Sequence, residues 1–213
     1  MEDKMKLKGF TLAEVLIALV IIGVVAAITV PIIIANSQEQ AIKSALKKNY
    51  SVLQQALQRY YVDNGEHYIF DEEYTIYDHY RFREEFILKY FNVAKDCSIV
   101  DCNLGDFEYK NYAGNKKSIY DNSNGYDSMV ILQDGSILDY GWGGGRAILI
   151  DVNGAKNPNT LGKDFFYFEY DESVGVYIPG GSKGVKENPN FCDKQNSSSS
   201  SGIGCTAKVL GKY

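Results

Sequence analysis

The sequence predicts an α+β protein in which a long N-terminal helix packs on a C-terminal antiparallel β-sheet. Three observations predict this fold class. Residues 10–35 form a continuous apolar run, and residues 36–64 continue it with apolar positions three and four apart, as on one face of a helix. From residue 128 the pattern changes to short apolar segments separated by turn residues, which is typical of an antiparallel sheet.

The composition limits the possible functions. The chain has 213 residues, a hydrophobic fraction of 45% and a formal net charge of −5. This length accommodates one domain with an appendage or two small domains, and the apolar content is sufficient for a packed core. An acidic chain has no general electrostatic attraction for nucleic acid, and no basic run is longer than two residues, as at Lys116-Lys117.

The first nine residues are too short and too polar to form a structural element, and we interpret them as a leader that is removed. The leader ends at Gly9, a residue with no side chain to obstruct a protease at the scissile bond. Its lysines are expected to keep the leader on the cytoplasmic side of a membrane. They are Lys4, Lys6 and Lys8.

Residues 10–35 are predicted to be the transmembrane half of a long helix. These 26 residues contain a single charge, Glu14. As a helix they extend over roughly 39 Å, which is enough to cross the hydrocarbon core of a bilayer. A secretory signal has a shorter apolar region, of roughly 7 to 15 residues, and keeps its charges before that region. Gly23 and Pro31 are the two positions where this helix is expected to weaken or bend.

Residues 36–64 are predicted to be the amphipathic half of the same helix, because they contain neither Gly nor Pro. Asn64-Gly65 is expected to end the helix, with Gly65 in the left-handed cap position. Residues 65–213 then form a globular head, and the amphipathic half is the predicted cover for one face of its sheet.

Within the head, a short helix is predicted over residues 79–94 and a polar loop over 110–125. Asp134-Gly135 is a hairpin turn signal. Residues 206–210 are compatible with a short strand or with one helical turn. The predicted strands are 128–132, 136–140, 146–152, 164–170 and 174–178.

The four cysteines fall into two local groups and lack the spacing and the nearby histidines of a zinc site. Behind an export segment, disulfides are the better interpretation, although four reduced thiols remain an alternative. Three pairings are possible, and loop closure favours the local one. That pairing joins Cys97 to Cys102 and Cys192 to Cys205.

The segment Gly9-Phe10-Thr11-Leu12-x-Glu14, with Lys8 before it, resembles the type IV pilin and type II secretion pseudopilin superfamily. The resemblance covers about residues 4–36, including Gly23 and Pro31. It implies a pilin-like fold and cleavage between Gly9 and Phe10 by a prepilin peptidase, which also methylates the new amine. It further implies a single-pass inner-membrane protein whose head is exported to the periplasm or cell surface.

The resemblance also implies the partners. Inner-membrane machinery would extract mature subunits from the bilayer into a filament, as a homopolymer or together with other pilin or pseudopilin subunits. In such filaments the helix often unwinds between the positions that match Gly23 and Pro31.

Glu14 is expected to act in assembly. A carboxylate at the centre of a spanning helix costs roughly 2.5–3.5 kcal/mol and is usually paired. Cleavage after Gly9 creates a cation, the amine of Phe10, four residues away on the same helix or within reach on a neighbouring subunit. Pairing removes two charges from lipid and so favours assembly. The alternative is that Glu14 is protonated or lies near the membrane interface.

A second candidate site lies between two predicted strands. Asp151, Asn153 and Asp164, with Asn159 nearby, supply oxygen ligands of the kind that calcium binds, and major pseudopilins often hold calcium in such a loop. The spacing departs from an EF-hand and there are only two carboxylates. The alternative, which the low ligand charge favours, is a turn that uses Asn, Gly and Pro for their backbone conformations.

Other segments give weaker signals. Gly141–Gly145 lacks the ending of a phosphate-binding loop, and we expect a turn or an exposed aromatic tip at Trp142. His67 and His79 stand among acidic residues, where a solvated loop competes with a metal site. The sequence contains no H-E-x-x-H motif and no Cys/His pair of the kind that forms a nucleophile, so we expect no enzyme.

We therefore expect a prepilin-like structural subunit of a type IV pilus or a type II secretion pseudopilus. The alternative is a membrane-anchored binding ectodomain, such as an adhesin or a minor pilin for DNA uptake. The subunit's place in its filament, major or minor, is left open.

Overall fold

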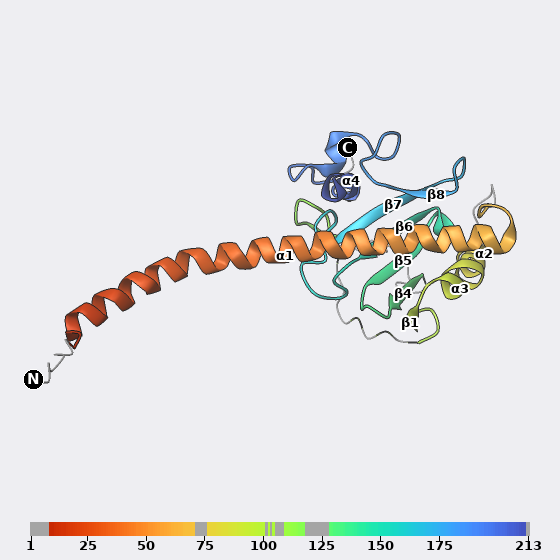
Figure 1. Ribbon diagram of the computed structural model, residues 1–213. Helices are drawn as coiled ribbons and strands as arrows, with labels where there is room; N and C mark the ends of the chain where they lie inside the picture. The colour runs from red at the N-terminus through yellow and green to blue at the C-terminus, as the bar shows by residue number, and fades with distance from the viewer. Residues whose placement is uncertain are drawn as a thin grey trace, which may run out of the picture. The chain divides into compact units, whose positions relative to one another are not determined.

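A computed structural model describes residues 9–70, 76–100, 102, 104, 109–117 and 128–211 (Figure 1). The chain divides into two compact units, Met1–Ala41 and Ile42–Tyr213. The long helix α1, Leu12–Asn64, contributes its first part to one unit and its second part to the other. A six-stranded antiparallel sheet forms the centre of the second unit, which confirms the predicted α+β fold.

The first part of α1 is exposed on all sides as far as residue 41 and is apolar, apart from Glu14 and Thr29, as far as Ala35. Within the described residues, α1 is the one helix long and apolar enough to cross a membrane, judged by length and composition. The helix continues without interruption through Gly23 and Pro31. Pro31 has no N–H to donate, so the carbonyl of Ala27 is left without its usual helical partner. The hydroxyl of Thr29 makes a local bond to the Val25 carbonyl at 2.9 Å.

The end of α1 follows the predicted cap. Gly65 has a φ of +77° and donates its N–H to the carbonyl of Tyr61 at 2.8 Å. A left-handed residue at this position is a common way to end a helix, and Gly adopts it at no steric cost.

The sheet has the order β1-β4-β5-β6-β7-β8, and every neighbouring pair is antiparallel. From β4 onward it is a simple meander in which each strand pairs with the next along the chain. These five strands match the five predicted ones. They are β4 Met129–Leu132, β5 Ile137–Trp142, β6 Ala147–Asp151, β7 Phe165–Asp171 and β8 Val176–Pro179.

The helix predicted over residues 79–94 is wrong at its C-terminal end. The structure has α2 at Ile76–Phe82, a π-helical turn at Arg83–Ile87 and α3 at Leu88–Tyr90. Val93–Asp96 is instead the edge strand β1, because its backbone pairs with β4, from Val93 opposite Leu132 to Asp96 opposite Val130. This pairing depends on a strand more than thirty residues away, so helical periodicity did not reveal it.

The loop predicted over residues 110–125 contains a short hairpin. Strand β2, Tyr109–Lys110, pairs with β3, Lys116–Lys117. The rest of that prediction, residues 118–125, lies outside the described residues. The ambiguous segment 206–210 is the helix α4, Thr206–Leu210.

One face of the sheet is covered by the amphipathic half of α1, as predicted. Leu46 and Leu53 are fully buried there, and the ring of Tyr50 stacks on Phe168 with centroids 5.6 Å apart. The sheet contributes buried apolar side chains to the same core, and they come from β4, β5, β6 and β7. They include Val130, Leu138, Ile148, Ile150, Phe166 and Phe168.

The opposite face is also buried, which the sequence analysis did not predict. Leu149 and Phe165 point into a second core that Tyr109, Leu161 and Ile203 cover. Tyr109 stacks on Phe165 with ring centroids 3.9 Å apart. The signal was present, since all five residues of β6 are buried and its sequence is apolar almost without alternation.

Of the two alternatives for residues 141–145, the turn is confirmed, since Gly143–Gly145 forms a single 3-10 turn, whereas Trp142 is not an exposed aromatic tip. Trp142 ends β5, is half-buried and packs edge to face against Tyr167 with centroids 6.3 Å apart. The glycines that follow allow a close approach of α2, because a Cβ on Gly145 would lie 2.5 Å from a ring carbon of Phe82. Any larger residue at position 145 would collide with this ring.

We expect Leu53→Ala to destabilise the head by about 3 kcal/mol, because it leaves a cavity between α1 and the sheet. The change is measured by denaturant unfolding of the full chain in detergent, followed through Trp142. Gln58→Ala, on the exposed side of α1, is the matched control and should have little effect. Equal stability of the two variants would contradict the proposed packing.

Candidate functional site

The N-terminal turn of α1 is organised by two residues, Thr11 and Glu14. Glu14 Oε2 accepts hydrogen bonds from the Thr11 N–H and the Thr11 hydroxyl, both at 2.8 Å, and the Glu14 N–H donates to Thr11 Oγ1 at 3.3 Å. This reciprocal arrangement is a capping box. We did not predict this capping box, although its signal, Thr followed three residues later by Glu, stands in the sequence.

The capping box places the carboxylate of Glu14 at the positive end of the helix dipole. Its second oxygen, Oε1, receives no hydrogen bond from the described residues and is available to a further donor. Phe10 is 87% exposed, and a Cβ on Gly9 would have no atom within 4 Å. The Gly9-Phe10 bond is therefore accessible, and an accessible carboxylate oxygen follows it by one helical turn.

These N-terminal residues all lie in one unit of the structure. In the unprocessed chain the nitrogen of Phe10 is part of a peptide bond, so pairing of its amine with Glu14 stays a prediction. The same holds for unwinding between Gly23 and Pro31.

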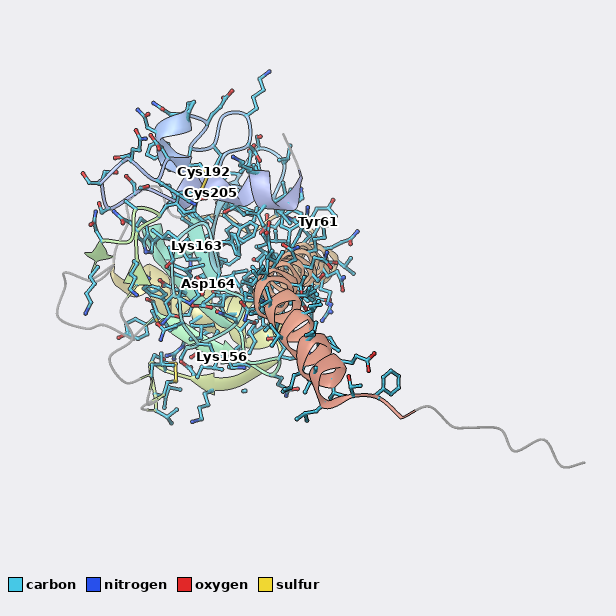
Figure 2. All side chains as sticks on the ribbon, turned by 90° about the vertical axis from the view of Figure 1, so that its left-hand side faces the viewer. Tyr61, Lys156, Lys163, Asp164, Cys192 and Cys205 are labelled. Carbon is cyan, nitrogen blue, oxygen red and sulfur yellow. A yellow bond between two sulfur atoms is a disulfide. The ribbon has the colours of Figure 1, made fainter. Side chains whose placement is uncertain are left out.

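The β6–β7 loop, residues 152–164, is organised around the buried carboxylate of Asp164 (Figure 2). Its oxygens accept N–H groups from Thr160 at 2.6 Å and Asn159 at 2.9 Å, and the amide of Asn153 at 3.2 Å. Asp151, at the end of β6, is also fully buried and accepts the Asn153 N–H at 3.2 Å. The structure therefore brings together the three predicted residues Asp151, Asn153 and Asp164.

Three buried oxygens in this loop have no hydrogen-bond partner among the described residues. They are Asp151 Oδ2, Asn153 Oδ1 and Asn159 Oδ1. Burial and then the charge of Asp164 raise the pKa of Asp151 to about 9, and burial also raises the pKa of Asp164. At neutral pH the two carboxyl groups are therefore stable together only if a proton or a cation compensates one charge.

These donors suit a hard cation, because all of them are carboxylate or amide oxygens. No group of three or more His, Cys, Asp or Glu side chains in the described part of the chain could hold a metal. Any ion here would therefore be bound by two carboxylates and neutral oxygens. His67, the other candidate, stacks on Tyr61 with centroids 4.7 Å apart.

The four cysteines form the two disulfides that loop closure favoured. Cys97 is bonded to Cys102, and Cys192 is bonded to Cys205. The second disulfide lies against the β6–β7 loop, since a Cβ on Gly162 would be 2.8 Å from the Cβ of Cys205. The crosslink thus fixes the C-terminal segment beside the candidate cation site (Figure 2).

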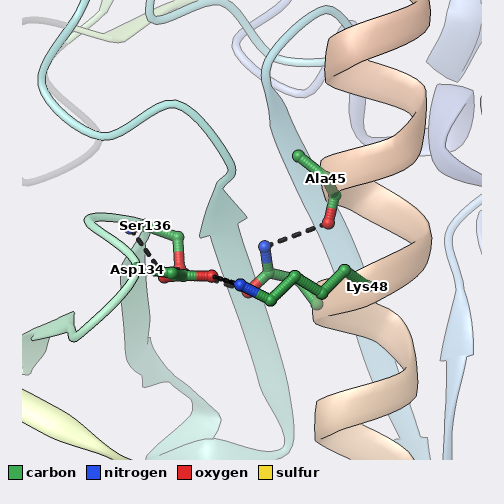
Figure 3. Close-up of polar contacts among 5 residues, drawn as sticks. Ala45, Lys48, Asp134 and Ser136 are labelled. Atoms are coloured by element: carbon green, nitrogen blue, oxygen red, sulfur yellow. Dashed lines mark hydrogen bonds and ion pairs between the residues drawn. The ribbon is translucent and has the colours of Figure 1, made fainter.

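A polar cluster ties α1 to the β4–β5 turn (Figure 3). Lys48 Nζ lies 2.8 Å from Asp134 Oδ2, and the N–H of Ser136 donates to the other oxygen of Asp134 at 3.0 Å. Partial burial raises the pKa of Asp134, but the bonds from Lys48 and Ser136 outweigh it and hold this pKa below its usual value. Asn49, fixed to the Ala45 carbonyl at 3.1 Å, accepts the Ser136 hydroxyl at 3.2 Å.

Comparison with known proteins identifies the N-terminal segment. Residues 4–30 match the family model of the prokaryotic N-terminal methylation motif, the signature of type IV pilins and pseudopilins. The match includes Gly9, Phe10, Glu14 and Gly23 and ends one residue before Pro31. The motif indicates a pilin-like prepilin subunit, hence a structural protein. No curated protein and no solved structure matches the chain.

In a chelating buffer, the free energy of unfolding should fall as pH rises through the interval between the ordinary pKa of Asp151, 3.8, and its folded pKa of about 9. The folded state holds this proton longer than the unfolded state, so deprotonation favours unfolding. Denaturant titrations across this pH range measure the effect.

Asp151→Asn should remove most of this pH dependence, because it keeps the shape without the charge. The matched control is Asp171→Asn, which changes the last residue of β7, an aspartate outside both cores whose pKa is lowered by its bonds to Ser173. A pH dependence that survives unchanged in Asp151→Asn would show that Asp151 is not the responsible group.

Proposed function

We propose that this chain, which carries the N-terminal methylation motif of type IV pilins and pseudopilins, is processed after Gly9 and assembled into a type IV pilus or a type II secretion pseudopilus. One observation carries the proposal. The motif at residues 4–30 overlaps an apolar segment, residues 10–35, that is long enough as a helix to span a bilayer and contains a single carboxylate, Glu14.

The proposed path of the protein follows from its N-terminal chemistry. The lysines of the leader hold residues 1–9 on the cytoplasmic side, and α1 anchors the chain in the inner membrane as a single span. A prepilin peptidase cuts the accessible Gly9-Phe10 bond. The head is exported to the periplasm or cell surface, and inner-membrane assembly machinery transfers the subunit into a polymer of one or several kinds of pilin subunit.

Glu14 is the proposed assembly residue. Its Oε2 already accepts two bonds from Thr11, so the carboxylate has a fixed position at the start of the helix. Its free Oε1 is one turn from the amine that cleavage creates at Phe10. A neighbouring subunit's amine at the same depth would neutralise the carboxylate, and each such contact fixes the axial register of two helices.

A binding ectodomain on a membrane anchor is the alternative function. It predicts that the head acts alone and that Glu14 has no role beyond local capping. The two proposals therefore predict different effects of a substitution at Glu14.

We expect Glu14→Gln to be cleaved normally and to fail in filament assembly, because it keeps the shape of the side chain and removes the charge. Sheared surface filaments measure assembly, and mass spectrometry of the membrane-extracted chain identifies the N-terminus. Glu39→Gln, which changes an exposed carboxylate further along α1, is the matched control.

Mass spectrometry should locate the N-terminus of the wild type and both variants at a methylated Phe10. An N-terminus at any other residue would contradict the proposed processing. Normal filaments from Glu14→Gln would favour the anchored ectodomain.

We also propose that the β6–β7 loop binds calcium. The three unpartnered oxygens of Asp151, Asn153 and Asn159 support this proposal, since buried polar atoms in folded proteins rarely lack partners. Calcium would supply the positive charge that Asp151 and Asp164 require. The ion would then stabilise the loop that adjoins the Cys192–Cys205 disulfide.

Millimolar calcium should raise the melting temperature of the wild type by roughly 5–10 °C when it is in about hundredfold excess over its dissociation constant. Asp151→Asn should lose this increase, whereas Asp171→Asn should keep it. Differential scanning calorimetry with calcium, magnesium or chelator makes the comparison. If calcium does not raise the melting temperature of the wild type, a proton is the compensating charge, and the calcium proposal is contradicted.

A further inference from the structure

One end of the head carries a concentration of lysines, although the chain as a whole has a net charge of −5. We call it the lysine end. It includes the first turns of α1 in the head, where the chain enters at Ile42, together with three loops. Its lysines are Lys43, Lys47, Lys110, Lys156, Lys163 and Lys194.

Hydrogen bonds join the three loops into one surface. The N–H of Lys110 donates to the Asn159 carbonyl at 2.9 Å, which ties the β2–β3 hairpin to the β6–β7 loop. The amide of Asn111 donates to the Ser198 carbonyl at 2.9 Å, which ties the same hairpin to the C-terminal segment. In Figure 1 these loops form the left-hand edge of the head, and Figure 2 views the molecule from that side.

The same surface reaches α1. Lys48 holds the β4–β5 turn through Asp134, and that turn contacts the β6–β7 loop, since a Cβ on Gly154 would lie 2.4 Å from the Gly135 carbonyl oxygen. Lys43 and Lys47 lie on α1 within one or two turns of Lys48. The helix and the three loops therefore share one end of the head.

The charge of this end is not balanced locally. Lys43, Lys47, Lys156 and Lys163 are exposed, and none has an ion-pair partner among the described residues. Lys194 lies over the ring of Tyr112, 5.4 Å from its centroid.

The acidic groups at this end are mostly engaged or buried. Asp134 is paired with Lys48, while Asp151 and Asp164 are buried. Asp193 and Glu187 of the C-terminal segment accept the N–H groups of Gln195 at 2.9 Å and Gly184 at 3.0 Å, and Glu39 is exposed on α1 one turn before Lys43. The described lysines of this surface outnumber these three carboxylates, so the surface attracts anions.

Covalent connectivity keeps Ile42, where the chain enters the lysine end, near the membrane that α1 is proposed to span. The apolar run ends at Ala35, and six residues, 36–41, separate it from Ile42. Even fully extended, they reach roughly 20 Å. This limit holds for any angle between the spanning helix and the head.

We propose that the lysine end binds the anionic head groups of phospholipids in the membrane that anchors α1. Lysine ammonium groups on flexible stems suit lipid phosphates, which offer charge without fixed geometry. The proposal rests on the proposed membrane anchor and adds a second contact to it. The contact holds the head on the bilayer before assembly, and its release is a step in extraction. Nucleic acid fits less well, because Lys194 covers the ring of Tyr112, which is therefore not open for a base to stack on.

The test uses the full chain in nanodiscs of phosphatidylcholine, with or without phosphatidylglycerol, and measures lysine acetylation by mass spectrometry. With phosphatidylglycerol, the acetylation rate at Lys156, Lys163 and Lys194 should fall by about fivefold at low salt. High salt should abolish this protection. Lys89, exposed on α3 outside the lysine end, is the internal control and should not change.

A double variant, Lys156→Ser with Lys163→Ser, should weaken the protection of Lys110 and Lys194, whereas Lys89→Ser should not. Equal acetylation in both lipid compositions would overturn the proposal. Protection that increases with the number of protein copies per nanodisc would also overturn it, because it indicates contact between copies. Protection by added duplex DNA but not by phosphatidylglycerol would overturn it in favour of nucleic acid. A chain that does not enter the nanodisc would contradict the anchor and this proposal together.

Discussion

The head depends on one contact, the packing of the second part of α1 against the sheet. In this contact, Leu46, Leu53 and Leu57 are shielded from water because they pack against the buried side chains of the strands. Burial of apolar surface is the main favourable contribution to folding. This part of α1 is therefore apolar on the side that faces the sheet and polar on the side that faces water. Residues 12–35 of the same helix make no such contact with the described part of the chain and are apolar on every side apart from Glu14 and Thr29, which suits a lipid environment.

Polar contacts then give this packing a fixed register. Lys48 and Asn49 hold the β4–β5 turn, which in turn lies against Gly154 of the β6–β7 loop. That loop contacts both the β2–β3 hairpin and the Cys192–Cys205 disulfide. The buried carboxylates of Asp151 and Asp164 are thus enclosed by segments from four parts of the chain. Their electrostatic cost is tolerated because packing on every side holds the loop in place.

At the other end of the sequence, Thr11 and Glu14 form a local unit that needs no tertiary support. The capping box satisfies donors at the helix start and leaves one carboxylate oxygen for a partner. A residue that caps its own helix is already oriented when that partner arrives, which lowers the entropic cost of the contact. The proposed roles of Glu14 in capping and in assembly are therefore compatible.

The sequence by itself determined the long helix, its Gly65 cap, five strands and the local pairing of cysteines, because each depends on periodicity or on residues close in sequence. Tertiary structure decided the rest. Val93–Asp96 became a strand because β4 offers an edge, and Trp142 was covered because Tyr167 lies across from it. The second buried face and the gathering of the lysines both join residues 40 or more positions apart. Such contacts depend on the fold, since no local pattern in the sequence specifies which distant segment will supply the partner.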